Sequence, residues 1–318
     1  GMLAGAMALG MTSAFAADPV TLQLKWVTQA QFAGYYVAQD KGFYEEENID
    51  ITIKPGSPDI APEQVLAGGG ADVAVAWMGG ALAARDQGAP LVNIAQPYKR
   101  SGLLLICPKD GPVQSEADFK GKTLGVWFFG NEYPFMAWMN KLGLSTDGDA
   151  DGVTVLKQNF DVSALVDKQA DCISVMTYNE LNQAADAGFT ADKLNIFNYS
   201  EMDNDLLEDG LYVMQDKLED PAFVDKMVRF VRASMKGWEY AIANPEEAAQ
   251  IIIDNDESGA QTLEHQIYMM SEVGKLIDPS DPSLDIEAYD RTERALLDQK
   301  IISAEPEGAY TTVVTDAL

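Results

Sequence analysis

The sequence predicts an α/β protein of two lobes, each a βαβαβ-based, mostly parallel sheet with flanking helices, with a ligand cleft between the lobes. Three observations support this prediction. Apolar, strand-like runs alternate with helical segments, as in α/β folds. Two segments with the same order of strands and helices echo each other about 100 residues apart. With 318 residues, the chain is long enough for two domains of ordinary size.

The repeat begins with a short strand that ends in tryptophan. The strand ending at Trp26 corresponds to the strand ending at Trp127, 101 residues later, and each leads into an aromatic-rich helix. Gly42 and Gly143 suit the C-terminal caps of these two helices. Each half therefore predicts the order strand, helix, strand, helix, strand. The further matched pairs are strands 51–53 and 153–155, Asp59 and Asp161, and strands 73–77 and 172–176.

The segments outside the repeat complete the lobes. The first crossover is expected after the apolar strand 103–107, and the return crossover within 196–213. The helical stretches after that most economically pack back on lobe one. We therefore expect lobe one at 18–107 and 205–318, and lobe two at 108–204. The expected C-terminal helices span 221–240, a stretch that begins at Pro245, 263–277 and 286–297.

The composition excludes several classes of function. The chain carries 50 acidic and 22 basic residues, a formal charge of −28, which disfavours binding to nucleic acid or anionic lipid. A single histidine, His265, and two cysteines, Cys107 and Cys172, nearly exclude a His/Cys metal site. Two buried free thiols are favoured over a disulfide, although an oxidising compartment would permit one.

The first residues resemble a targeting segment. Residues 1–17 are apolar or small and contain Ala14-Phe15-Ala16, which fits the h-region and cleavage site of a signal peptide. The basic n-region is missing, so the natural start is expected upstream; a buried helix is the alternative. No cysteine stands at the cleavage site, and no later stretch is long enough to span a bilayer. We expect a soluble, exported protein without a lipid anchor, which fits a periplasm best.

The repeat also predicts which residues line the cleft, because ligands of open α/β sheets bind beyond the carboxyl ends of the strands. Aromatic rings at strand ends suit stacking on a flat ligand, although any single ring could equally belong to the core. Carboxylates and amides there can accept hydrogen bonds from ring N–H and amino groups, or alternatively cap helices. The candidate ligand-binding residues are Trp26, Gln31, Phe32, Tyr36, Trp77, Trp127, Asn131, Glu132, Tyr133, Asn159, Tyr178 and Glu180.

Neither an anion site nor a catalytic site is predicted. Lys25, Lys157 and the pair 99–100 are isolated bases and form no convincing donor cluster, which weighs against nitrate, sulfonates and simple carboxylates. The motifs of serine hydrolases, phosphate-binding loops and zinc proteases are missing. We expect no catalytic residue, no cofactor and no metal.

The segment 29–44, with QAQFAGYYVA followed by KGFY, resembles the opening of periplasmic ligand-binding proteins of ABC importers. The similarity is closest to the thiamine-pyrimidine-synthase-like subgroup. This subgroup includes binders of hydroxymethylpyrimidine and formylaminopyrimidine and relatives that bind riboflavin. Segments 127–133, 178–180 and 245–248 are also similar to it, so the resemblance covers about residues 20 to 255.

The resemblance implies a type II periplasmic binding protein that closes on its ligand by hinge bending. The implied partners are a planar heterocycle and an ABC permease in the inner membrane, and a monomer is expected. A thiamine pyrimidine precursor is the first choice of ligand and riboflavin the second. The same fold includes eukaryotic enzymes that make the thiamine pyrimidine from their own histidine and pyridoxal phosphate. Those enzymes carry a cysteine-rich iron motif and a sacrificial histidine, which this chain does not match.

Three alternatives stay open at this point. A synthase could use Lys25 or Lys54 to form a Schiff base with a cofactor. A sensor domain would bind the same ligand but report it to a signalling partner. An anion binder for sulfonate or nitrate would depend on Lys25 or Arg100.

Overall fold

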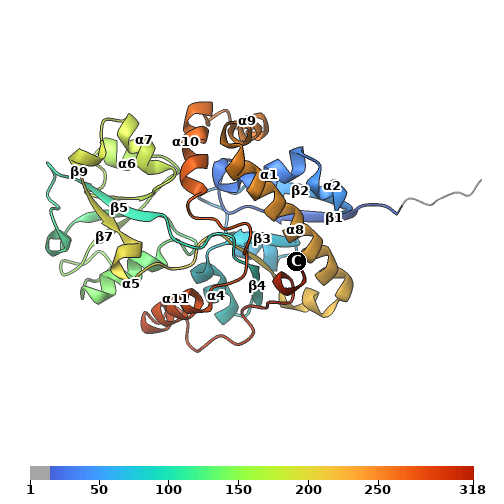
Figure 1. Ribbon diagram of the computed structural model, residues 1–318. Helices are drawn as coiled ribbons and strands as arrows, with labels where there is room; N and C mark the ends of the chain where they lie inside the picture. The colour runs from blue at the N-terminus through green and yellow to red at the C-terminus, as the bar shows by residue number, and fades with distance from the viewer. Residues whose placement is uncertain (1–14) are drawn as a thin grey trace, which may run out of the picture.

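The computed structural model describes residues 15–318 and contains two α/β lobes that lie side by side (Figure 1). Most of the predicted signal peptide, residues 1–14, lies outside the described residues. The two-lobed α/β prediction is confirmed. Both sheets are mixed, but in each one a single strand runs against the others.

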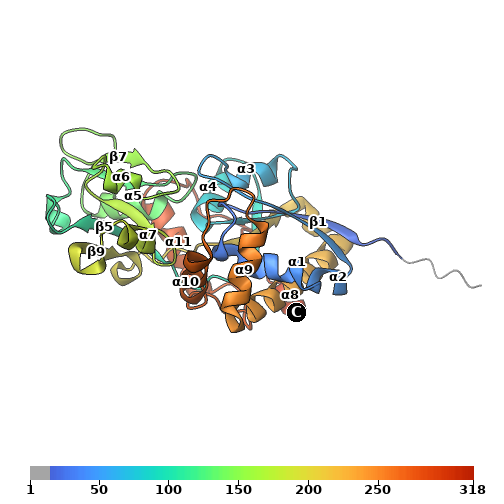
Figure 2. The ribbon, with the colours of Figure 1, turned by 90° about the horizontal axis from the view of Figure 1, so that it is seen from above.

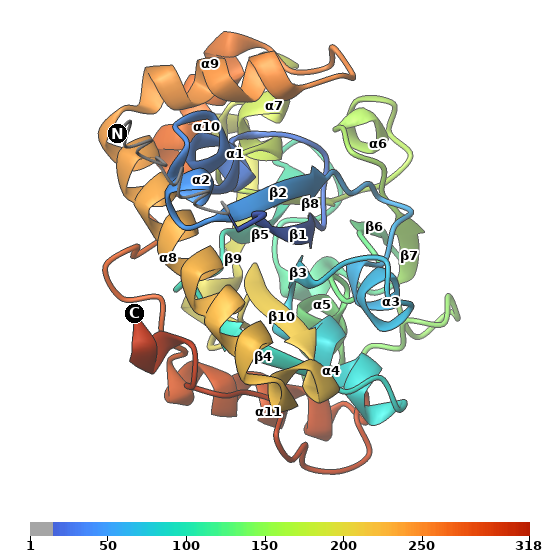
Figure 3. The same cartoon turned by 90° about the vertical axis from the view of Figure 1, so that its right-hand side faces the viewer.

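The sheet of lobe one has the strand order β2-β1-β3-β10-β4. β1 pairs in parallel with β2 and β3, whereas β10 is antiparallel to both of its neighbours. Figure 3 shows the strands of this sheet one beside another, with β10 between β3 and β4. Its strands are β1 Asp18–Gln23, β2 Ile49–Lys54, β3 Val73–Ala76, β4 Leu91–Ala95 and β10 Gly210–Met214.

Lobe two repeats this order with different strands. β6 pairs in parallel with β7, β5 is antiparallel to β8 and β9, and a bridge between Leu124 and Cys172 joins the two groups. The resulting order, β7-β6-β8-β5-β9, matches lobe one with β5 in the place of β10. The strands are β5 Leu103–Pro108, β6 Thr123–Val126, β7 Thr154–Lys157, β8 Ile173–Met176 and β9 Leu194–Asn198.

The strand expected at 103–107 lies in the second sheet and not in lobe one. β5 pairs with β8 and β9, so the chain leaves lobe one before Leu103 and not after Cys107. A short apolar strand fits the interior of either sheet, and only its long-range partners decide between them. The two lobes thus exchange one strand each. β10 follows the strands of lobe two in sequence but pairs with β3 and β4 in the sheet of lobe one. The return crossover at 199–209 lies within the predicted range.

Two equivalent aspartates strengthen the case for the repeat. A carboxylate oxygen of Asp72 accepts from the backbone N–H of Thr21 at 2.7 Å, and one of Asp171 accepts from that of Thr123 at 2.9 Å. In both pairs the aspartate N–H donates in return to the carbonyl of the same threonine. Each pair ties the approach to the third strand of a lobe to its first strand. The predicted βαβαβ order is present in both lobes.

Helix α8 is the longest helix and packs closely against α1 (Figure 2). A Cβ atom on Gly34 would lie 2.2 Å from the ring of Trp238, and one on Gly237 would lie 2.0 Å from the carbonyl oxygen of Gly34. Both positions therefore require glycine. Within residues 15–318, no helix combines the length and the apolar character needed to cross a membrane. The helices of lobe one are α1 Ala33–Asp40, α2 Phe43–Glu46, α3 Pro62–Ala67, α4 Met78–Asp86, α8 Pro221–Ala243, α9 Pro245–Asn255, α10 Leu263–Val273 and α11 Ile286–Asp298.

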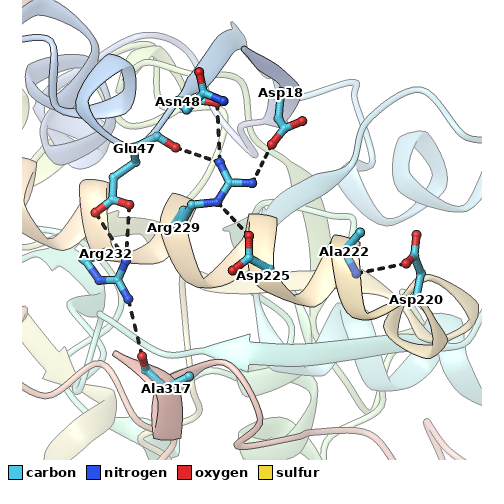
Figure 4. A network of polar contacts seen from close by, with 9 residues as sticks. All are labelled: Asp18, Glu47, Asn48, Asp220, Ala222, Asp225, Arg229, Arg232 and Ala317. Atoms are coloured by element: carbon cyan, nitrogen blue, oxygen red, sulfur yellow. Dashed lines mark hydrogen bonds and ion pairs between the residues drawn. The ribbon is translucent and has the colours of Figure 1, made fainter. Parts of the chain in front are cut away.

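Arg229 fastens α8 to the first two strands (Figure 4). Its guanidinium donates to the carboxylates of Asp18 at 2.5 Å and Asp225 at 2.9 Å. It also donates to the backbone carbonyls of Glu47 at 2.7 Å and Asn48 at 3.4 Å. A planar guanidinium can satisfy several acceptors at once, so one side chain holds the starts of β1 and β2 against the helix.

The C-terminal helices begin where the sequence predicts, but not all of them pack on lobe one alone. α9 and α10 lie against α1 and the turn before it, as expected. α11 packs on α4 of lobe one and also on α5 of lobe two, so it bridges the lobes. The helices of lobe two are α5 Tyr133–Lys141, α6 Ser163–Val166 and α7 Glu180–Asp186.

Cys107 and Cys172 form a disulfide, so the expectation of two free thiols is wrong. Cys107 lies in β5, and Cys172 directly precedes β8, which is the antiparallel neighbour of β5. The two Cα atoms are therefore only 4.3 Å apart, as in closely spaced antiparallel pairs. The 65-residue separation of the cysteines concealed this pairing in the sequence.

Candidate ligand-binding site

A small cavity of about 20 Å³ lies between the lobes, beyond the carboxyl ends of β1, β3 and β8. The position agrees with the rule that ligands of open α/β sheets bind at this edge. Its wall combines aromatic rings with amide and charged side chains. The residues that line it are Lys25, Trp26, Gln29, Gln31, Trp77, Trp127, Asn131, Met176, Tyr178, Asn179 and Glu180.

Three tryptophans close the cavity from opposite sides. Trp26 and Trp77 follow strands of lobe one, and Trp127 follows β6 of lobe two. The rings of Trp26 and Trp127 meet edge to face across the cleft, with their centroids 6.0 Å apart. Their exposed fractions are 8%, 4% and 5% in chain order. The largest apolar cluster runs through these rings from one lobe to the other, so the lobes are closed on each other.

Lys25 is the cation of the cavity. Its ammonium nitrogen donates to Oδ1 of Asn131 across the cleft at 2.6 Å and lies 4.4 Å from the centroid of the Trp77 ring. The side chain is buried, and no carboxylate among residues 15–318 forms an ion pair with it. Burial lowers the pKa of Lys25. The negative charges of Asp209, Glu208, Glu63 and Glu180 oppose this shift, Asp209 most strongly.

Hydrogen bonds between side chains continue along the wall of lobe one. Asp209 accepts from the indole N–H of Trp77 at 2.9 Å and, with its other oxygen, from Nε2 of Gln31 at 2.7 Å. Gln31 in turn accepts from Nε2 of Gln29 at 2.8 Å. Asp209 thus fixes the orientation of the Trp77 ring and of the two glutamine amides, although it lies behind the cavity wall.

The same chain of hydrogen bonds crosses to lobe two through Asn179. The amide nitrogen of Asn179 donates to Gln29 at 3.2 Å and to Glu180 at 2.7 Å, while its oxygen is 2.7 Å from Nε2 of His265. The other ring nitrogen of His265 is 3.0 Å from the amide nitrogen of Asn182. These distances fit the neutral tautomer that donates from Nε2 and accepts at Nδ1. The histidine therefore joins α10 to α7 and orients an amide of the cavity.

Burial raises the pKa of the acids around Lys25. The pKa of Glu180 rises to about 7, although the N–H groups of Met176 and Asn179 favour its charged form. Burial also raises the pKa of Asp209, and it raises that of Glu208 well above its ordinary value. The positive charge of Lys25 opposes the shift in each of these groups.

The structure brings seven of the twelve sequence-predicted residues to the cavity wall. These are Trp26, Gln31, Trp77, Trp127, Asn131, Tyr178 and Glu180. Phe32 and Tyr36 lie in the core, because Phe32 is fully buried and the hydroxyl of Tyr36 bonds to Thr28. Both come from the α1 region, whose apolar side chains pack inward on the lobe.

The other three predicted residues serve the loops around the site. Glu132 turns back and accepts from the backbone N–H of Gly130 at 3.0 Å. Asn159 contributes its backbone carbonyl, which accepts from the indole N–H of Trp127 at 2.9 Å. Tyr133 lines a separate surface hollow beside Gly80.

Four residues of the cavity wall are not among the twelve candidates. Lys25, Gln29, Met176 and Asn179 line the cavity, and the first of these stood out only as an isolated base. Its position directly before Trp26 was the signal that could have found it. Asp209 lies in the return crossover, outside the repeat, so no pattern in the sequence connected it to Trp77.

A second small cavity, of about 10 Å³, adjoins the first. The two share Lys25, Trp26, Trp127 and Asn131, and the second continues toward Ser57. Its other lining residues are Pro58, Ile60, Pro62, Phe128, Phe129 and Gln158. In the described part of the chain, no group of three or more His, Cys, Asp or Glu side chains is arranged to hold a metal ion.

Comparison with known proteins places this geometry in context. The model of the NMT1/THI5-like family matches residues 29–248. A riboflavin-binding protein, RibY, from Chloroflexus aurantiacus is 28% identical over 79% of this chain and 71% of that protein. A formylaminopyrimidine-binding protein from Halalkalibacterium halodurans is 25% identical over 76% of this chain and 72% of that protein.

More distant proteins share parts of this similarity. A 4-amino-5-hydroxymethyl-2-methylpyrimidine phosphate synthase from Candida albicans is 27% identical over 73% of this chain and 69% of that enzyme. Among solved structures, the ligand-binding component of an ABC-type import system from Staphylococcus aureus has a TM-score of 0.70 at 10% identity. It covers 95% of this chain and 99% of that one. At such low identity it shows the shared fold alone. The comparisons confirm the resemblance stated from the sequence.

Proposed function

The chain belongs to the NMT1/THI5-like family, and on this premise we propose that it is the substrate-binding protein of an ABC importer. Its ligand is a small planar heterocycle, in first place a pyrimidine precursor of thiamine. The observation that carries this proposal is the cavity closed by Trp26, Trp77 and Trp127 from both lobes. Formylaminopyrimidine and riboflavin, for which two relatives are named, are both flat nitrogen heterocycles.

The cavity offers what such a ring needs. Trp26, Trp127 and Tyr178 stack on the ring or wall it in, because flat aromatic faces gain most from parallel or edge contacts. Glu180 accepts from its amino or ring N–H groups, and Gln31 and Asn131 complete the hydrogen bonds. Around this group, Glu132 and Asn159 position the loop that carries Trp127, while Phe32, Tyr36 and Tyr133 support the walls through packing.

Riboflavin is the second candidate, and the adjoining cavity favours it specifically. A pyrimidine precursor needs only the space of the inner cavity, widened when the lobes move apart. A flavin needs more length, and the second cavity extends the site from the shared residues Lys25 and Trp26 toward Ser57. The choice between the two ligands therefore depends on whether both cavities are filled.

Capture and release require the lobes to open about the two crossover segments. These segments are tied together where the backbone N–H of Ser101 donates to Asp205 at 2.7 Å and its hydroxyl bonds to Glu208. Hinge bending here would separate Trp26 from Trp127 and break the bond between Lys25 and Asn131. We propose that the protein works as a monomer in the periplasm and delivers its ligand to an inner-membrane permease.

We propose no chemistry for the site, although some relatives are named as synthases. A Schiff-base enzyme would hold its cofactor on a lysine such as Lys25. We expect no absorbance band at roughly 400 nm when pyridoxal phosphate is added, and such a band would favour the synthase.

Thermal unfolding against a panel of ligands tests the proposed function. The panel comprises hydroxymethylpyrimidine, formylaminopyrimidine, thiamine, riboflavin, taurine and nitrate. At 100 times its dissociation constant, a ligand stabilises the protein by about 2.7 kcal/mol, which corresponds to a rise of about 4 °C for a chain of this length. A rise with a pyrimidine or flavin alone is expected. A rise only with an anion would contradict the proposal.

A further inference from the structure

The ammonium group of Lys25 is buried without a counter-ion. Its side chain lies in a wall made by Trp26, Trp77 and Trp127, and no carboxylate among the described residues 15–318 pairs with it. Burying an unpaired charge is costly, and folded proteins avoid it where no function requires it. The position of Lys25 therefore calls for an explanation outside the chain itself.

Two of the acids around Lys25 have both oxygens engaged elsewhere, and Glu208, which keeps one oxygen without a partner, forms no ion pair with Lys25. Both oxygens of Asp209 are held, one by Trp77 and the other by Gln31. Both oxygens of Glu180 are held by the N–H groups of Met176 and Asn179. The nearby acids thus contribute long-range attraction but no partner.

One hydrogen bond leaves most of the capacity of the ammonium group unused. A lysine has three N–H donors, and within residues 15–318 only Asn131 accepts from Lys25, while the ring face of Trp77 takes a second side. Lys25 also lines both cavities, at the place where they join. An N–H donor of Lys25 therefore remains without an acceptor among the described residues, at the place where the two cavities join.

We propose that Lys25 is a specificity-determining residue that selects heterocycles with a carbonyl oxygen at the edge facing it. The carbonyl accepts from the ammonium group and gives the buried charge its missing partner, which a purely aminated ring cannot do. This inference rests on the proposed function and refines its ligand class. A formamide substituent and the dione edge of a flavin both meet the requirement, whereas an aminomethyl group, which is cationic at neutral pH, would be repelled.

The test compares two ligands that differ only in the formyl group: formylaminopyrimidine and its deformylated aminomethyl counterpart. Calorimetric affinities of the wild type and Lys25→Met are measured for both, with riboflavin as a third ligand. Lys236→Met is the matched control, because Lys236 also lies over an aromatic ring, that of Phe43 at 4.3 Å, but is exposed and far along α8.

The wild type should prefer the carbonyl ligands. Lys25→Met should weaken them about 10- to 100-fold, as expected for losing a charged hydrogen bond, and should bind the aminomethyl ligand as well as the wild type or better. Lys236→Met should change neither. An equal loss for both pyrimidines, or no loss for any carbonyl ligand, would overturn the inference while leaving the proposed function intact.

The melting temperature of the ligand-free protein shows whether Lys25→Met weakens binding only because it destabilises the fold. Because the ammonium group has no ion-pair partner, ligand-free Lys25→Met should melt at the same temperature as the wild type or higher. A lower melting temperature would show that Lys25 is a counter-ion of the acids, and would also overturn the inference. If the wild type binds none of the heterocycles, the proposed function itself fails, and the inference fails with it.

Discussion

Glu63 provides the sharpest prediction from the buried acids. It follows Pro62 in the first turn of α3, and only 5% of its surface is exposed. Burial raises the pKa of Glu63 to about 7 from an ordinary value of 4.5. Replacing it in Glu63→Gln keeps the shape of the side chain but removes the titration. The variant therefore isolates the cost of burying this charge.

The direction in which stability changes with pH follows from the linkage between proton binding and folding. Folding raises the pKa of this carboxyl, so the folded state binds its proton more tightly than the unfolded state. The free energy of unfolding is therefore highest below pH 4.5, where the group is neutral in both states, and it falls as the pH rises through about 7. At 1.36 kcal/mol per pKa unit, the loss by pH 8 is about 3 kcal/mol. Glu63→Gln should thus match the wild type near pH 4.5 and exceed its free energy of unfolding by about 3 kcal/mol at pH 8.

Urea unfolding followed by tryptophan fluorescence at both pH values measures this difference. Glu246→Gln is the matched control, because Glu246 also follows a proline in the first turn of a helix, α9, but is exposed. It should show no pH-dependent gain. If the two variants behave alike, or if the gain of Glu63→Gln is the same at both pH values, the argument from burial is wrong.

Two further variants test the cavity and the disulfide. Trp127→Ala should weaken ligand binding about 10- to 100-fold through lost stacking, measured by calorimetry, whereas Phe160→Ala, an exposed ring of the same lobe, should not. Reducing the Cys107–Cys172 disulfide should lower the free energy of unfolding in urea by about 4 kcal/mol, as loop entropy predicts for a 65-residue separation; an unchanged midpoint would contradict this.

Much of the fold could be predicted because the sequence contains the same order of strands and helices twice. The strands ending before Trp26 and Trp127 recur at a fixed offset, and the same is true of the helices and strands that follow them. The exchange of β5 and β10 between the lobes escaped prediction, since both are apolar strands whose partners lie far away in sequence. The same distance hid the pairing of Cys107 with Cys172.

The site was predictable where position along a strand decides it. Trp26, Trp77 and Trp127 reach the cavity because each follows the end of a strand, whatever else surrounds them. Glu132 does not line the cavity, because its carboxylate accepts a hydrogen bond from the backbone N–H of Gly130 in the same loop. The contribution of Asp209 depends on a contact 132 residues away along the chain, with Trp77, and no local pattern could reveal it.

The role of Lys25 shows what sequence alone leaves open. One isolated base beside aromatic residues gives no sign of whether it faces solvent or a ligand. Burial, the bond to Asn131 from the other lobe and the lack of an ion-pair partner among residues 15–318 became visible only in the folded chain.

A fluorescence titration tests the central claim most directly, because three tryptophans surround the cavity. Formylaminopyrimidine and riboflavin are each added to the purified protein, with taurine and nitrate as comparisons. We predict saturable quenching by at least one heterocycle, with one ligand bound per chain, and none by either anion. Saturation with taurine or nitrate, or no response to any heterocycle, would contradict the claim that this cleft holds a flat ring.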